Sequence, residues 1–465
     1  MTSLWPSVVK EFRALFPLWI ASIAVIGLRP FRPNDILEVM AELAYVFGSL
    51  VLGAHMIGHE HSSRTLGILL VQPVDRRRLW ITKLAVLTPM LVTLAAVAWY
   101  MIFNQLGEPR PSLATVLLPV FGGLFVAPWI TMVFRQQLGG VMVTGIVAGW
   151  SMVTISLLTV KLSGLDIAQA ERLGLEIWTW TMYAFAAISA VLGWRTFMRL
   201  EAIDGAGKDI QLPRWFRTAE RARGGHPVWM LIRKELRLQQ LTFMMAGFFA
   251  AGELLRWILE MNGLISPDRS VREALITIYV AAIALVAGSL ASAEERHSGM
   301  LESQQLLPMP ASQQWIIKAG VAVGLALLLG IGPVAVLTYA DRLGEGIRGA
   351  LPAFGSGALL ILVMTACGLY VSSLSTSGVR ALALAFPFLL GTYLLFQYVV
   401  ASMGVIASAV FYAAFLFAAL LLFFAGANHR RTDRSSPRVL WQLGSLTAFI
   451  VAGVPLLTVL LYPAF

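Results

Sequence analysis

The feature that most constrains this chain of 465 residues is that its sequence repeats itself. Lys-Glu-Phe-Arg at 10–13 returns as Lys-Glu-Leu-Arg at 234–237, and a tryptophan precedes each copy by five residues. A second set of positions recurs at one constant spacing: Glu60 and Glu295, Ser63 and Ser298, Leu66 and Leu301, Pro73 and Pro308, Trp80 and Trp315, Lys83 and Lys318. An internal duplication of this length predicts two structural halves of the same design.

The composition places both halves in a membrane. Hydrophobic residues make up 58% of the chain and charged residues 13%, whereas soluble domains carry roughly 25% charged residues. A helix satisfies all of its backbone polar groups internally, and about 20 apolar residues cross a bilayer core of about 30 Å. The sequence therefore predicts an all-α polytopic membrane protein.

Thirteen charge-poor windows are the predicted spans. Six lie in the first half: 14–28, 37–57, 81–104, 112–134, 138–160 and 177–198. Seven lie in the second half: 241–264, 274–293, 316–340, 350–374, 381–401, 404–425 and 439–462. The predicted organisation is a first six-helix half (1–198), a basic cytoplasmic linker (199–226), a second six-helix half (227–428), and a basic loop with one extra C-terminal helix (429–465).

The cations set the orientation. With the N terminus inside, about 25 of the 35 Lys and Arg residues fall on one side, which the positive-inside rule makes cytoplasmic. This asymmetry explains the net charge of +10 without nucleic-acid binding. Six spans separate the repeated loops, and an even number returns the chain to the same side, so we expect the halves to be parallel repeats. The predicted location is the cytoplasmic membrane of a bacterium, with a cytoplasmic N terminus.

Each half begins with a short amphipathic stretch. Residues 5–13 and 229–237 mix aromatic and aliphatic side chains with Lys10, Arg13, Lys234 and Arg237 just before a predicted span. Such a composition is typical of a helix that lies in the headgroup plane, and we expect an elbow helix in each half.

A longer loop follows the second predicted span of each half. The segments 60–83 and 295–318 contain leucine-rich stretches among charged residues, and each carries a proline. A partly apolar helix at the cytoplasmic surface needs a partner to cover it, either another protein or lipid alone.

These features resemble the ABC-2-type permeases, the membrane subunits of ATP-binding-cassette exporters. The resemblance covers nearly the whole chain and rests on the elbow segments and on the repeated loops, which run from Glu60 to Lys83 and from Glu295 to Lys318. Two features depart from the family pattern: both permease halves share one chain, and a thirteenth span is appended.

The resemblance implies a mechanism and partners. The two loops would be coupling helices that dock on a separate ATPase subunit, through Glu60, Arg64, Leu66, Pro73, Asp75, Arg76, Glu295, Leu301 and Pro308. ATP and Mg would bind the ATPase, so this chain would be a non-catalytic exporter permease without a cofactor of its own. Because the halves are fused, one permease chain would suffice for each complex.

The sequence offers little support for chemistry within this chain. The segment Gly205–Asp209 lacks the first glycine and the Ser or Thr of a Walker phosphate loop. His55 and His59 share a helix face, but the pattern is not that of a zinc protease, and we predict neither a metal site nor a catalytic residue.

Ionisable groups inside the spans are few. Glu253 and Arg256 lie at membrane depth, where charges mark substrate paths, although their spacing also lets them pair with each other. This scarcity predicts an apolar or amphiphilic cargo rather than a small ion.

Two other classes stay open. A major-facilitator-like secondary transporter also has two parallel six-helix halves, and Asp75-Arg76-Arg77-Arg78 resembles the Asp-Arg loop signature of that family. A membrane scaffold or assembly factor is the third possibility. Transport without any ATPase would favour the secondary transporter.

Overall fold

A computed structural model of the chain describes residues 5–28, 35–62, 75–103, 111–134, 137–163, 166–199, 227–262, 269–297, 309–341, 351–375, 377–430 and 435–461. Every regular element in these ranges is helical, as the apolar composition predicts. The chain divides into two compact units, one formed by Met1–Ala222 with Gly252–Pro267 and the other by Arg223–Ala251 with Asp268–Phe465. The predicted linker, 199–226, lies outside the described residues except for Arg199.

The helices of the first half are α1 (Trp5–Gly27), α2 (Asp35–Ser62), α4 (Arg76–Ala98), η2 (Trp99–Phe103), α5 (Leu113–Phe121), η3 (Gly122–Val126), α6 (Ala127–Phe134), α7 (Gln137–Leu162) and α8 (Ile167–Met198). The η elements are single π-helical turns. Thus α4 continues into η2, and α5, η3 and α6 together form one span.

The helices of the second half are α10 (Pro227–Leu238), α11 (Gln240–Met261), α12 (Arg269–His297), α14 (Ala311–Asp341), α15 (Leu351–Leu374), α16 (Gly378–Met403), α17 (Ala407–His429), α18 (Ser436–Ala448), η6 (Phe449–Gly453) and α19 (Val454–Leu461). The last three elements form the extra C-terminal span, which packs on α16 and α17.

Twelve helices of the described residues are long and apolar enough to cross a membrane, and each matches one of the thirteen predicted spans. The one predicted span without a matching candidate helix among the described residues is 14–28, nearly all of which lies in α1. Lys10, Glu11 and Arg13 occupy the N-terminal half of α1, so the apolar part of this helix is shorter than the roughly 20 residues that a span needs.

Helix α1 nevertheless runs antiparallel to α2. Glu11 and Glu60 share one lysine partner, and further along the pair a Cβ on Gly48 would overlap the side chain of Ser22. The predicted elbow, 5–13, is therefore continuous with the rest of α1. Leu15 and Leu18 are buried, and the helix continues through Pro17 to Gly27.

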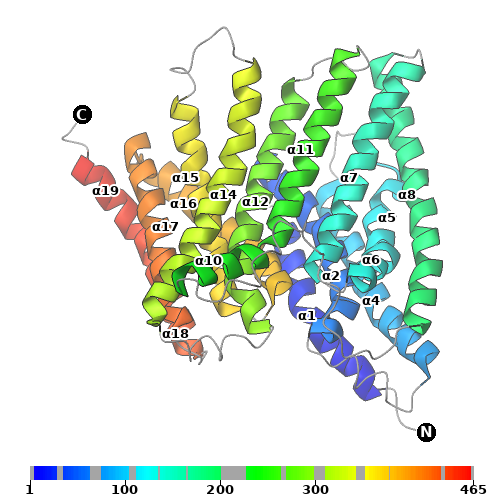
Figure 1. Ribbon diagram of the computed structural model, residues 1–465, viewed down its shortest axis with the longest axis horizontal. Helices are drawn as coiled ribbons and strands as arrows, with labels where there is room; N and C mark the ends of the chain where they lie inside the picture. The colour runs from blue at the N-terminus through cyan, green and yellow to red at the C-terminus, as the bar shows by residue number, and fades with distance from the viewer. Residues whose placement is uncertain are drawn as a thin grey trace. The chain divides into compact units, whose positions relative to one another are not determined.

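The second half differs at the equivalent point, because a turn at Gln239 separates α10 from α11. The side-chain amide of Gln239 donates to the carbonyl of Ala287 at 2.9 Å, and its oxygen accepts from Thr242 at 2.7 Å. Figure 1 shows α10 running crosswise to α12 and α14, which both contact it.

The second predicted span of each half is its central helix. In α2, 72% of the most apolar window is buried, and in α12 the share is 61%. Glycines permit close helix approach at both helices: a Cβ on Gly53 would overlap the backbone of Gly123, and one on Gly288 would overlap the backbone of Thr365.

Candidate functional site

Four charged side chains from three helices meet inside the first unit. Lys83 of α4 places its Nζ 2.8 Å from Glu11 Oε1 of α1 and 3.0 Å from Glu60 Oε1 of α2, and it donates to the carbonyl of Met56 at 3.0 Å. The side chains of Lys83 and Glu60 are each only 2% exposed. Lys10 stands at the edge, 3.7 Å from Glu60 and 54% exposed. We call Lys10, Glu11, Glu60 and Lys83 the first cluster.

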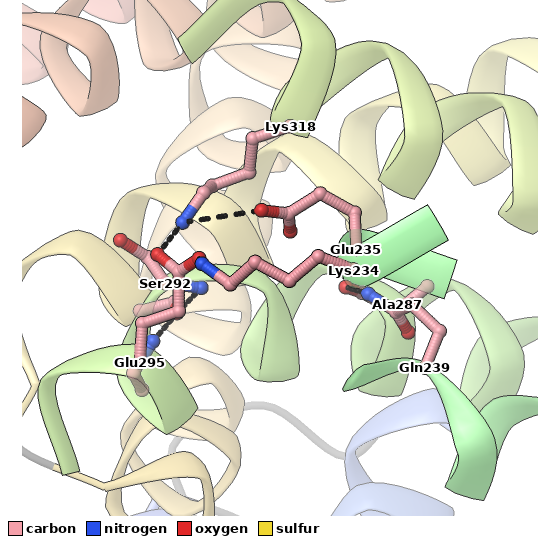
Figure 2. Close-up of polar contacts among 9 residues, drawn as sticks. Lys234, Glu235, Gln239, Ala287, Ser292, Glu295 and Lys318 are labelled. Atoms are coloured by element: carbon pink, nitrogen blue, oxygen red, sulfur yellow. Dashed lines mark hydrogen bonds and ion pairs between the residues drawn. The ribbon is translucent and has the colours of Figure 1, made fainter. Parts of the chain in front are cut away.

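The second unit contains a cluster of the same residue types, from α10, α12 and α14 (Figure 2). Lys234 donates to Glu295 Oε1 at 2.6 Å. Lys318 pairs with Glu295 Oε2, and its Nζ lies 3.9 Å from Glu235 Oε1. Glu235, Glu295 and Lys318 are buried, whereas the Lys234 side chain is 28% exposed. We call Lys234, Glu235, Glu295 and Lys318 the second cluster.

The two clusters occupy equivalent positions of the repeated sequence. Lys10 and Glu11 recur as Lys234 and Glu235, and the remaining pair of each cluster also belongs to the repeat, with Glu60 matching Glu295 and Lys83 matching Lys318. These recurrences are visible in the sequence, but the meeting of the four residues in space is not. The available signal was the return of opposite charges at fixed spacing in a chain that is otherwise poor in charge.

Burial dictates that these charges stay paired. An isolated charge in an apolar interior costs several kcal/mol, so a buried ion is stable only beside a partner of opposite sign. Each cluster contains two lysines and two glutamates, and its formal charges therefore cancel. The result in each unit is a neutral polar junction that fixes three helices relative to one another.

Each cluster lies at the base of a repeated loop. Glu60 stands near the end of α2 and Lys83 in the second turn of α4, so their ion pair joins the two ends of the intervening loop. Glu295 and Lys318 do the same for the loop between α12 and α14. The loop segments 63–74 and 298–308 themselves lie outside the described residues.

In the second cluster, burial shifts the two groups that α10 contributes. Desolvation raises the pKa of Glu235, and the charges of Lys318 and Lys234 oppose this shift. Desolvation also lowers the pKa of Lys234, while Glu235 acts in the opposite direction. Both shifts disfavour the charged forms, as expected when the loss of water is the largest contribution.

Of the residues predicted to contact an ATPase, four belong to the described part of the chain, and Arg64, Leu66, Pro73, Leu301 and Pro308 lie outside it. Glu60 and Glu295 are buried in the clusters, so a docking role for their side chains stays a prediction.

The other two described residues of this set lie at the N terminus of α4. Asp75 caps the helix, since its carboxylate accepts from the backbone N–H of Arg77 at 3.1 Å. Arg76 donates to the carbonyl of Met198 at 2.7 Å and so ties α4 to the end of α8. Arg77 and Arg78 are exposed. This basic surface is the described part of the first predicted coupling segment.

The predicted elbow residues divide between two environments. Lys10 and Lys234 pair with glutamates of the clusters, although Lys10 is itself largely exposed. Arg13 and Arg237 are exposed and belong to neither cluster. One helical turn therefore carries both a buried junction and an exposed cation.

The predicted substrate-path residues lie on α11 and pair with each other. Arg256 Nε lies 2.9 Å from Glu253 Oε2, and the same guanidinium also pairs with Glu260. The spacing of three and four residues puts all three on one helix face. The pairing of Glu253 with Arg256 that their spacing allows is thus confirmed, and a role in cargo passage stays a prediction.

A buried hydrogen-bond network, which was not predicted from the sequence, joins helix α18 to α15 and α17 within the second unit. Gln442 of α18 exchanges two hydrogen bonds with Asn428 of α17, at 2.9 and 3.2 Å, and accepts from Tyr370 of α15 at 3.3 Å. Asn428 also donates to Ser373 at 3.1 Å. All four residues are buried. The four residues lie on three different helices, and no sequence spacing connected them.

Comparison of the chain with protein-family models, with curated proteins and with solved structures finds no match.

Proposed function

We propose that this chain is the membrane permease of an ATP-driven exporter of the ABC-2 type, working with a separate ATPase subunit. The observation that carries the proposal is the pair of equivalent buried clusters, one at the base of each repeated loop. Each repeated loop is anchored by a buried cluster of ion pairs. A partner that binds both loops could therefore displace helices in both halves of the duplicated protein.

The clusters give such a loop a mechanical role. When a partner displaces the first loop, the ion pair of Glu60 and Lys83 moves the ends of α2 and α4 together, and Glu11 draws α1 along. A buried pair resists separation because leaving one charge unpaired costs about 3–5 kcal/mol. The second cluster couples α10, α12 and α14 in the same way. Loop movement therefore becomes movement of three helices in each half.

In this proposal the two clusters and both loops lie on the cytoplasmic side of a bacterial cytoplasmic membrane. ATP and Mg bind only the ATPase, and the fused halves let one permease chain serve one complex. The cargo is apolar or amphiphilic, because α5, α7, α12, α15 and α17 carry no charged residue within their candidate spans. The appended helix, α18 to α19, distinguishes the chain from a plain pair of permease halves.

The test is a pull-down of the tagged chain from its native membrane. We compare wild type with R77E/R78E, which reverses two exposed charges beside the first loop and leaves Asp75 and Arg76 intact. The matched control is R430E/R438E, which makes the same charge change in the last basic loop.

Wild type and control are expected to co-purify an ATPase. R77E/R78E is expected to reduce the amount of co-purified ATPase at least about tenfold, since placing acidic side chains against a partner surface that complements the arginines costs several kcal/mol. Recovery of the chain without an ATPase in all three preparations would overturn the proposal. Proton-driven cargo uptake by that isolated chain would then establish a secondary transporter.

A further inference from the structure

Helix α10 presents two chemically different faces. Leu231 and Glu235 are buried on one side, and Glu235 belongs to the second cluster. Trp229, Arg233 and Arg237 recur every four residues, so they form a stripe on the opposite side. At twelve residues the helix is far too short to cross a bilayer, and it directly precedes a candidate span.

The outer stripe combines apolar surface with positive charge. Trp229 and the adjacent Met230 are 52% and 54% exposed. The guanidinium of Arg233 lies over the Trp229 ring, 5.6 Å from its centroid, which holds the cation beside the apolar surface. Arg237 is exposed one turn further on. Among the described residues, neither arginine takes part in an ion pair.

This combination matches the boundary between headgroups and acyl chains. Tryptophan and methionine side chains suit the acyl boundary, while two arginines one turn apart suit an anionic phosphate. The only carboxylate of α10 is that of Glu235, and it faces the opposite side of the helix, so the stripe carries uncompensated positive charge. Its complement is an anionic lipid.

We infer that α10 is a binding site for an anionic phospholipid, whose phosphate is held by Arg233 and Arg237 and whose acyl region covers Trp229 and Met230. The inference needs only that the chain lies in a membrane, and it does not rest on ATP-driven transport. Because the buried face of α10 belongs to the second cluster, the lipid would stabilise the position of α10 against α12 and α14.

The first half provides an internal control. At the position equivalent to Arg233, helix α1 has Val9, so Arg13 is the only arginine of the corresponding stripe. Removing the charge of Arg13 changes the same kind of surface by one charge without touching a paired site.

The experiment is native mass spectrometry of the full chain in detergent, titrated with phosphatidylglycerol and, separately, with zwitterionic phosphatidylcholine. Near a membrane surface each cation contributes about 1 kcal/mol toward an anionic lipid, so R233Q/R237Q should weaken the tightest phosphatidylglycerol site roughly 30-fold. Binding of phosphatidylcholine should change by less than about threefold, because the double variant removes only charge. R13Q should leave the tightest site within about threefold of wild type, and R233K/R237K should retain most of the preference because it keeps both charges near the membrane surface.

Arg237 is exposed and Arg233 half-buried, and among the described residues neither takes part in an ion pair, so misfolding of these variants is unexpected. Their melting midpoints are measured alongside. An unchanged phosphatidylglycerol affinity in R233Q/R237Q would overturn the inference and would point to a protein as the cover of this face. An equal loss in R13Q would also overturn it, because the effect would then be one of net charge.

Discussion

The first and second clusters use the same four residue types but organise them around different centres. In the first, Lys83 is the hub, within 3.0 Å of both carboxylates and of the Met56 carbonyl, while Lys10 is a distant and exposed neighbour. In the second, Glu295 is the hub and receives both lysines, while Glu235 stands 3.9 Å from Lys318.

The duplicated sequence therefore preserves the charge balance of the cluster but not its geometry. A buried cluster is stable as long as its charges cancel and each has a close partner, and more than one arrangement of two lysines and two glutamates satisfies this condition. The consequences of losing a single member should therefore differ between the halves, although the sequence positions are equivalent.

The largest expected effect separates the two central lysines. Among the described residues, K83M leaves Glu60 with only the exposed Lys10 and removes the lysine that pairs with Glu11, so we expect a loss of about 3–5 kcal/mol of stability. K318M is expected to cost less, because Glu295 keeps Lys234 at 2.6 Å. The measurement is the thermal melting midpoint of each purified variant in the same detergent.

Because K83M is expected to yield little folded protein, the double variant K83M/E60Q accompanies it and removes one of the stranded charges. Coupling between contacting residues is typically about 0.5–3 kcal/mol, so the double variant should be more stable than K83M alone. Equal losses in K83M and K318M would show that the two hubs are not distinct.

A smaller effect should distinguish the two outer lysines. K234Q removes a 2.6 Å charged hydrogen bond from a buried carboxylate and should cost about 1.5–3 kcal/mol. K10Q removes a 3.7 Å contact from a largely exposed side chain and should cost about 0–1 kcal/mol. The same melting assay measures both variants, and the comparison between the clusters would fail if K10Q cost as much as K234Q.

The smallest effect is the dependence of stability on pH. The folded pKa of Glu235 is raised above its ordinary value of 4.5, so the folded protein binds more protons than the unfolded chain between these two pKa values. The stability contribution of Glu235 is thus complete below about pH 4.5 and is lost as pH rises through the folded pKa. Each pH unit that separates the two pKa values corresponds to about 1.4 kcal/mol.

Melting midpoints measured from pH 4.5 upward check this sign. E235Q, which cannot titrate, should show a flatter profile than wild type over this range. E235D keeps a carboxyl at the same position and serves as the matched control. A wild-type slope that survives in E235Q would assign the pH dependence to another group.

Much of the fold could be predicted because a membrane imposes simple requirements. Twelve of the predicted apolar windows match candidate spans in the structure, since the length of an apolar helix determines whether it can cross a membrane. Helix α1 fell outside that set because Lys10, Glu11 and Arg13 interrupt its apolar stretch. Its antiparallel packing along α2 depends on contacts such as that of Ser22 beside Gly48, which composition does not reveal.

The candidate site was only partly predictable. Repetition identified Glu60, Lys83 and their counterparts as a recurring set, and the resemblance to ABC-2-type permeases implied that the two glutamates contact an ATPase, which stays a prediction. The structure places both glutamates in buried ion pairs, because the turns that carry them face neighbouring helices. No local pattern states which way a charged side chain at a helix end points.

The hydrogen-bond network around Gln442 has a consequence for how the protein is made. Tyr370, Ser373 and Asn428 are synthesised before Gln442, so the network is completed only when the final helix enters the membrane. Insertion of that helix is therefore required to complete the network. A cell that monitors polar side chains left within lipid would recognise a chain stalled before this point as unfinished.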